Sequence, residues 1–335
     1  MSSLSTAQLI LNASSQLTIY VSFIILFSGI FGHIANIFVF TRLEIFRGNP
    51  SAFYLIAESI ADILELMIPF TSRIAISGFN NDLTQRSLVW CKLRPLVLQS
   101  ITLVSLSIVC FSSIDQYLTT SYYPFLKQIS TIKLAKILIT ISTIFWTLHG
   151  TSVLFIFQIH STYGCNIYNQ NFSNYVTYGY YVIFTGVLPI TISTFFSVLA
   201  YRNVRRIVRR QMIIRRRKLD QQLTAMILVR VGFFVIMTIP YLLQRIYALS
   251  AITNDSSVIS QAIVQLIGNI TLALFYFNYA GSFYLFLISS TRFRRQVKHV
   301  FINKCWKVCC KKRLRQNQVG TLTQCSASEY DLQSI

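Results

Sequence analysis

The chain has 335 residues, of which 53% are hydrophobic and 12% are charged, whereas about a quarter of the residues of ordinary soluble domains are charged. Because a soluble fold of this size would lack the polar residues to cover its surface, the composition excludes a soluble globular protein and predicts an integral membrane protein. The net charge of +20 is concentrated in two clusters, with nine basic residues between Arg202 and Lys218 and ten between Arg292 and Arg315. Since both clusters follow apolar stretches, the positive-inside rule explains them better than nucleic-acid binding does. It places both in the cytosol, beside anionic lipid headgroups.

Seven apolar stretches are long enough to cross a bilayer as helices, which predicts an all-α integral membrane protein with a seven-transmembrane helix bundle. Their expected bounds are Leu17–Phe40, Ala52–Ile76, Leu88–Thr119, Leu134–Phe157, Val176–Tyr201, Leu223–Leu249 and Val258–Ile288. An odd number of spans puts the two termini on opposite sides of the membrane. With an outer N-terminus, both basic clusters fall inside, as the charge rule requires.

The segments outside the bundle are short. Residues 1–16 are uncharged, lack the basic n-region of a signal peptide and are expected as an extracellular tail before the transmembrane region 17–290. Glycosylation sequons begin at Asn12, Asn171 and Asn254, all on the expected outer side. No outer loop is long enough for a core of its own, so a ligand site must be built between the spans or from these loops.

Residues 291–304 have apolar side chains at helical spacing with basic residues between them, which predicts a short amphipathic eighth helix on the inner membrane surface. Cys305, Cys309 and Cys310 follow it and are candidates for palmitoylation, the alternative being reduced cytosolic thiols. The remainder of the cytoplasmic tail, 305–335, is polar and contains Ser and Thr residues that a kinase could phosphorylate.

Ionisable residues at membrane depth are costly and are usually functional. The second span contains Glu58, Asp62 and Glu65, whose spacing of four and three puts them on one helical face that must point into the bundle. Arg230 of the sixth span lies near the level of Glu58. We therefore expect Arg230 to pair with Glu58 or Asp62 and to bridge the second and sixth spans; the alternative is that its side chain extends towards the cytosol.

A second polar group is expected in the outer half of the bundle, where positive charge in a low dielectric would favour a carboxylate or another acidic group of a ligand. A peptide or a small acidic molecule is the expected ligand. The alternative is that Glu65 neutralises one of the arginines and the group is purely structural. The expected pocket residues are Arg73, Leu98, Gln99, Thr102, Tyr241 and Arg245.

A series of landmarks in chain order resembles the rhodopsin-like (class A) G-protein-coupled receptors, over about residues 17–304. The landmarks are Asn36, Asp62, the pair Cys91 and Cys165, Trp146, Pro189, Pro240 within FFVIMTIPY, and the triplet Asp115-Gln116-Tyr117 at the inner end of the third span. The resemblance is compatible with a neuropeptide-type receptor or an orphan receptor. It implies a disulfide between Cys91 and Cys165.

The resemblance also implies roles for residues inside the spans. Asp62 resembles the family's sodium-binding aspartate, with Ser105, Asn278 and Ser282 as further candidate ligands of a sodium ion. Leu98 stands where amine receptors have an aspartate, which argues against an amine ligand. The seventh span contains no lysine, so retinal has no attachment point.

Several positions depart from the family pattern. Gln116 stands where the family has an arginine, Thr238 where it usually has a tryptophan, and Ser282 where its seventh-span asparagine lies. Asp220, at the inner end of the sixth span, is the expected partner of Gln116. A neutral glutamine makes a weaker latch than an ion pair, so raised basal activity or altered coupling is expected.

The sequence therefore predicts a plasma-membrane G-protein-coupled receptor that binds an extracellular ligand and signals to a heterotrimeric G protein through movement of the sixth span. The alternatives are an atypical chemosensory or decoy receptor with weakened coupling and, from another class, a transporter. No repeated halves support a transporter. No catalytic cluster supports an enzyme, and no cofactor is expected beyond the sodium ion.

Overall fold

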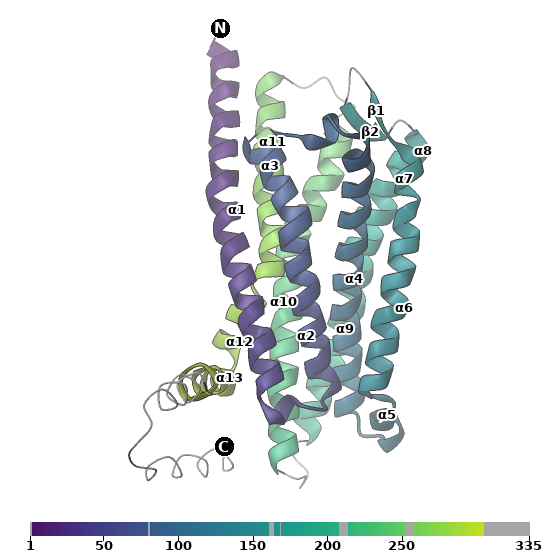
Figure 1. Ribbon diagram of the computed structural model, residues 1–335, viewed down its shortest axis with the longest axis vertical. Coiled ribbons are helices and arrows are strands. Elements are labelled where there is room, and N and C mark those ends of the chain that lie inside the picture. Colours follow the sequence, from purple (N-terminus) through teal and green to yellow (C-terminus); the bar gives the residue numbers. More distant parts are fainter. Residues whose placement is uncertain are drawn as a thin grey trace, which may run out of the picture. The chain divides into compact units, whose positions relative to one another are not determined.

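The computed structural model describes residues 2–79, 81–160, 164–167, 169–207, 214–251 and 257–304. The chain divides into two units, Met1–Arg294 and Arg295–Ile335, and the packing described below belongs to the first. Within it, long helices lie side by side as a bundle (Figure 1). The all-α class and the helical bundle predicted from the sequence are confirmed.

Helices cover all seven expected stretches. Six of the helical segments are long and apolar enough to cross a membrane: Leu4–Arg42, Leu88–Thr120, Ile132–Ile156, Gln170–Arg206, Leu219–Tyr247 and Val258–Ala280. The second expected span is helical as well, but it consists of three consecutive pieces and contains four ionisable side chains. Its pieces are α2 (Pro50–Glu65), the π-helical η2 (Leu66–Phe70) and α3 (Thr71–Phe79).

Local chemistry sets the bounds of these pieces. The Asn49 side chain accepts a hydrogen bond from the Ala52 amide and Pro50 occupies the first turn of α2, which together start the helix. Pro69 lies inside η2. Because proline has no amide hydrogen and its ring presses on the preceding turn, the wider π-helical turn accommodates it without ending the helix.

The first helix, α1 (Ser2–Arg42), is longer than the expected span, because residues 2–16 are helical as well. The first 28 residues contain neither glycine nor proline, so nothing breaks the helix. Two hydrogen bonds attach this extension to the bundle: Ser15 Oγ donates to the Gly78 carbonyl at 2.6 Å, and Asn269 Nδ2 donates to Ser14 Oγ at 2.9 Å.

The third span is the helix α4 (Leu88–Thr120), which contacts α2, α6 (Ile132–Thr151), α9 (Leu188–Ile207) and α10 (Ile214–Ala251). This central helix therefore meets most of the bundle. The fourth span continues from α6 into α7 (Val153–Ile156), and the fifth begins with α8 (Gln170–Asn174) and the π-helical η4 (Tyr175–Val187). The seventh comprises α11 (Val258–Ala280) and α12 (Ser282–Ser289).

Short elements connect the spans. On one side these are η1 (Glu44–Phe46) and α5 (Pro124–Ile129), and on the other η3 (Leu83–Gln85) and an antiparallel hairpin of β1 (Phe157–His160) and β2 (Gly164–Ile167). The hairpin was not predicted. It pairs Ile159 with Cys165 and so holds that cysteine at the top of α4.

Residues 291–304 are helical, as expected for the eighth helix: α13 (Thr291–Lys298) leads into the π-helical η5 (His299–Lys304). Phe293, in the first turn of α13, is fully buried, and its ring centroid lies 5.7 Å from that of Phe40 and 5.9 Å from that of Phe286. These rings join the start of α13 to the ends of α1 and α12.

Candidate functional site

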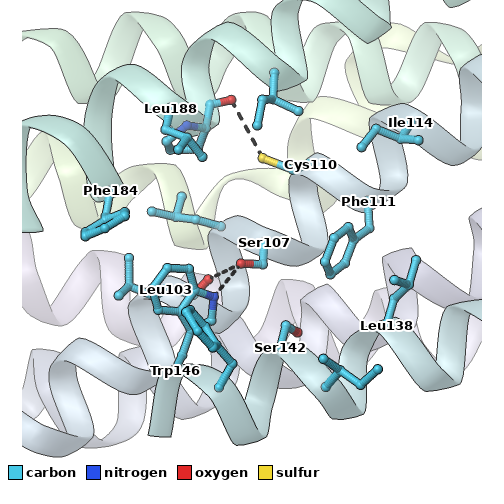
Figure 2. A pocket seen from close by; sticks show the side chains of 15 residues that line it. Leu103, Ser107, Cys110, Phe111, Ile114, Leu138, Ser142, Trp146, Phe184 and Leu188 are labelled. Carbon is cyan, nitrogen blue, oxygen red and sulfur yellow. Dashed lines mark hydrogen bonds between the residues drawn. The ribbon is translucent and has the colours of Figure 1, made fainter. Parts of the chain in front are cut away.

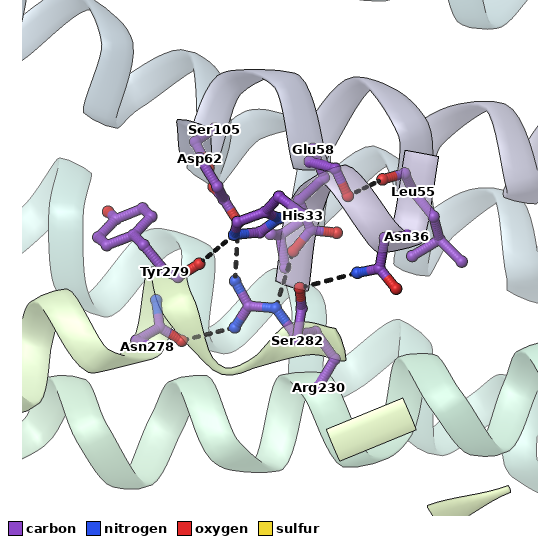
Figure 3. Close-up of polar contacts among 12 residues, drawn as sticks. His33, Asn36, Leu55, Glu58, Asp62, Ser105, Arg230, Asn278, Tyr279 and Ser282 are labelled. Carbon is purple, nitrogen blue, oxygen red and sulfur yellow. Dashed lines mark hydrogen bonds and ion pairs between the residues drawn. The ribbon is translucent and has the colours of Figure 1, made fainter. Parts of the chain in front are cut away.

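A buried ion pair lies at the centre of the bundle (Figure 3). Arg230 of α10 donates from Nε to Glu58 Oε1 of α2 at 2.8 Å, and its Nη2 lies 3.8 Å from Asp62 Oδ2. Its Nη1 donates to Asn278 Oδ1 of α11 at 2.5 Å. Arg230 is 2% exposed, Glu58 3% and Asp62 0%. The expected pairing of Arg230 with the acidic face is therefore present, and the guanidinium points into the bundle rather than towards the cytosol.

The first span adds two polar residues to this cluster. His33 Nε2 is hydrogen-bonded to the Tyr279 carbonyl and lies 3.7 Å from Asp62 Oδ2. Asn36 Nδ2 donates to Ser282 Oγ at 3.2 Å. Together with Arg230, these contacts connect spans one, two, six and seven at one level, which we call the central polar cluster.

The four candidate sodium ligands lie in this cluster but have other partners. Ser105 Oγ donates to Asp62 Oδ1 at 2.6 Å, Asn278 accepts from Arg230, and Ser282 accepts from Asn36. Within the part of the chain that the structure describes, no group of three or more His, Cys, Asp or Glu side chains is arranged to hold a metal ion. The positive charge among these oxygens is that of Arg230.

Neutral hydrogen bonds join the Gln116 end of α4 to α10. Gln116 Nε2 donates to Thr224 Oγ1 at 2.6 Å and to the main-chain carbonyl of Asp220 at 3.2 Å, both on α10. The expected contact with Asp220 thus exists, but through its backbone rather than its carboxylate. Thr224 was missed because a threonine in an apolar span gives no sequence signal for a latch. Tyr117 packs on Phe196, with centroids 5.6 Å apart.

Asp115 is buried beside this latch and bonds to two serines. Ser51 Oγ donates to its Oδ2 at 2.6 Å and Ser130 Oγ to its Oδ1 at 2.5 Å. Asp115 therefore ties the start of α2 and the loop after α5 to α4, and none of these contacts reaches α10. Neither serine was predicted.

At the disulfide end, three arginines gather between α3, α4 and α10. Arg245 donates from Nε to Tyr241 Oη at 3.1 Å, and its guanidinium carbon lies 4.9 Å from the Tyr181 ring centroid. Arg94 donates from Nε to Ser72 Oγ at 2.6 Å. Arg73 lies near enough to Arg245 and Arg94 for their charges to repel its own.

The charge of these arginines is not compensated by a carboxylate among the described residues. The Nε atom of Arg73 is buried and has no hydrogen-bond partner. Glu65, the residue expected in the alternative to neutralise one of them, accepts instead from Thr102 Oγ1 at 3.1 Å. Arg94 was not among the predicted pocket residues. A basic residue near the outer end of an apolar span is a sequence signal that could have identified it.

The remaining expected pocket residues contact other groups. Gln99 is hydrogen-bonded to His149 Nδ1 at 3.0 Å, and His149 Nε2 to the Tyr175 hydroxyl. This chain of bonds joins α4, α6 and η4. Leu98 is partly buried. The pocket residues that lie together are thus Arg73, Tyr241 and Arg245, with Arg94 added.

A disulfide joins Cys91 of α4 to Cys165 of β2, as the family resemblance implied, with their Cα atoms 5.8 Å apart. The candidate glycosylation residues Asn12 and Asn171 are exposed. Asn254, Cys305, Cys309 and Cys310 lie outside the described residues, so their expected modifications remain predictions.

An apolar cavity of about 330 Å³ lies between α4, α6 and the fifth span (Figure 2). Phe111, Phe145, Trp146 and Phe184 contribute to its lining, and the Trp146 indole donates to Ser107 Oγ at 2.8 Å. Phe145 is 57% exposed, so the cavity opens at the side of the bundle that faces lipid. With no charged lining residue, it is not a site for an acidic ligand.

Comparison with known proteins gives one match. Residues 34–280 match the family described as 7 transmembrane receptor (rhodopsin family). A search of curated protein sequences finds no match. The matched region covers most of the chain and contains Glu58, Asp62 and Arg230 of the central polar cluster, Gln116 with its partners on α10, and the three arginines.

Proposed function

Because the chain belongs to the rhodopsin family of seven-transmembrane receptors, we propose that it binds an acidic extracellular ligand at the disulfide end and signals to a cytosolic G protein by movement of α10. The observation that carries the ligand class is the cluster of Arg73, Arg94 and Arg245, which lacks a carboxylate partner among the described residues. Holding like charges together is unfavourable unless an anion joins them. A peptide with acidic side chains and a small multivalent carboxylate both meet this requirement.

The orientation in the plasma membrane follows from two observations. A stable disulfide forms in an oxidising compartment, and the bond between Cys91 and Cys165 lies at the end of α4 opposite to the basic segment that begins at Arg202. The basic segment belongs in the cytosol by the charge rule. Both observations support an extracellular disulfide end and an extracellular N-terminus.

Signal transfer uses the contacts of α10 with its neighbours. Ligand bound to Arg245 would favour one position of α10, and outward movement of its other end would break the hydrogen bonds of Gln116 to Thr224 and Asp220. The cleft opened there would receive the G protein. Arrestin would bind the same end after phosphorylation of the tail.

The experiment is a screen of acidic peptides and small polycarboxylates against the full-length receptor with a promiscuous G-protein readout. For an active compound, Arg94→Gln and Arg245→Gln should each raise the half-maximal concentration about 10- to 150-fold, since a hydrogen bond to a charged group contributes about 1.5–3 kcal/mol. Arg86→Gln, an exposed outer-loop arginine, is the matched control and should leave the response unchanged. Activation by a neutral or cationic compound that is insensitive to both substitutions would contradict the ligand class.

A second candidate function is a decoy or chemosensory receptor with weakened coupling. Gln116 favours it, because the resemblance puts an arginine at this position and Gln116 makes neutral bonds instead. A ligand that binds the purified receptor but elicits no G-protein activation from the natural sequence, and does so from Gln116→Arg, would establish this alternative.

A further inference from the structure

The central polar cluster already contains its cation. Each of the three guanidinium nitrogens of Arg230 faces a different oxygen-bearing side chain: Nε faces Glu58, Nη1 faces Asn278 and Nη2 faces Asp62 (Figure 3). These residues come from α2 and α11, whereas Arg230 comes from α10. All four are at most 3% exposed, so bulk ions do not compensate the carboxylates.

A small hard cation such as sodium would need several of the same oxygens. The Asn278 side-chain oxygen accepts from Arg230, and the Ser282 hydroxyl accepts from Asn36. Of the four candidate ligands, this leaves Asp62 and Ser105, which are bonded to each other at 2.6 Å. These two side chains have three oxygens, too few for a hard cation, so the residues present do not fit a sodium ion while Arg230 holds this position.

We propose that the Arg230 guanidinium takes the place of an inorganic cation in this receptor, so that the bundle is insensitive to sodium. Removal of Arg230 would uncover a latent sodium site formed by Glu58, Asp62, Ser105 and Asn278. The guanidinium differs from a bound ion in how it responds to movement of the helices. A diffusible ion can leave when the helices move, but the guanidinium is covalently part of α10 and must move with it.

The remaining negative charge of the cluster does not restore a cation site. Besides Arg230, Asp62 contacts the Ser105 hydroxyl and His33, whose Nε2 lies 3.7 Å from Oδ2, and the carboxylates of Glu58 and Glu65 lie on the same face of α2. A cation entering beside Asp62 would meet a positive guanidinium at 3.8 Å from the same oxygen. Repulsion at this distance is strong in a buried environment.

The test is thermal unfolding of the purified full-length receptor, measured in sodium chloride and in choline chloride at equal ionic strength. No ligand or G protein is needed, so the outcome is independent of the proposed function. The natural protein should unfold at the same temperature in both salts. Arg230→Met should unfold at a lower temperature in choline chloride and should regain stability in sodium chloride, with a dependence that saturates as sodium rises.

Two further variants control this test. Arg230→Met combined with Asp62→Asn should lose the sodium response, because a central oxygen anion is gone. Arg230→Lys keeps the positive charge and should remain insensitive to sodium even if Arg230→Met does not fold. A sodium-specific rise in the unfolding temperature of the natural protein would overturn the proposal, because sodium would then bind beside the guanidinium. If Arg230→Met folds but its unfolding temperature does not depend on sodium, the proposal of a latent sodium site is overturned.

Discussion

Reversing the charge of Arg230 tests whether the ion pair with Glu58 holds α2 and α10 together. Arg230→Glu would place a third carboxylate beside Glu58 and Asp62, all buried, with no basic partner from α10. Breaking one side of a buried pair costs about 3–5 kcal/mol, because the remaining charge is left without a partner. The single reversal should therefore lower the free energy of unfolding by at least this amount.

The double variant Arg230→Glu with Glu58→Lys should recover a large part of the loss. Lysine at position 58 would lie one turn from Asp62, and glutamate at position 230 would lie beside Asn278, whose amide can present its Nδ2 hydrogens instead of its oxygen. Opposite charges would again face each other across α2 and α10. We expect a favourable coupling energy of about 1–3 kcal/mol in the double-mutant cycle, within the range for residues in contact.

The assay is thermal unfolding of the detergent-solubilised receptor, with the amount of folded protein at the cell surface as a second readout. Arg86→Glu reverses an exposed arginine and should change stability by less than about 0.5 kcal/mol. If the double variant is no more stable than Arg230→Glu alone, the interaction between positions 58 and 230 does not stabilise the bundle. The reasoning from the buried pair is then wrong.

Three other perturbations test separate features. Gln116→Arg can make charge-assisted bonds to α10 in place of two neutral ones, so ligand-free G-protein activation should fall, by up to about tenfold for 1.4 kcal/mol; identical basal signals would exclude Gln116 as the latch. A Cβ at Gly29 would lie 2.8 Å from the Ala280 Cβ, so Gly29→Ala should cost about 1–3 kcal/mol in thermal unfolding. Gly232→Ala, which meets nothing within 4 Å, should gain up to about 1 kcal/mol. Replacing Cys91 by serine opens a link across 74 residues and should lower stability by about 2–5 kcal/mol, with no further loss in a reducing agent.

The sequence was sufficient for features that depend on burial alone. Seven apolar stretches must be helices in a membrane, because their backbone groups have no other partner there. Glu58 and Asp62 must face inward and meet a positive charge, which left Arg230 as the nearest candidate in the sixth span. The ion pair could be predicted for this reason.

Features that depend on the rotation of a helix about its axis were not predictable in the same way. Each residue added to a helical turn rotates the following side chains by about 100°, and the π-helical η2 lies between the acidic face and Arg73. A regular helix extrapolated from Asp62 therefore does not give the orientation of Arg73, although the expected grouping of Arg73 with Tyr241 and Arg245 is present. The partners Asn278 and Thr224 depend likewise on how α11 and α10 turn towards their neighbours, and neutral polar residues leave many such orientations open.

Two contacts of α10 with its neighbours differ in strength. The bonds of Gln116 are neutral and contribute about 0.5–1.5 kcal/mol each, whereas loss of one partner of the buried pair at Arg230 costs about 3–5 kcal/mol. Arg245, in the proposed ligand site, is 245 − 230 = 15 residues from Arg230 on the same helix, or about 22 Å at 1.5 Å per residue. In the proposed mechanism, a movement of α10 that starts at Arg245 meets the ion pair of Arg230 before it meets the hydrogen bonds of Gln116. We therefore expect the central polar cluster to contribute more to the threshold for activation than the Gln116 end does.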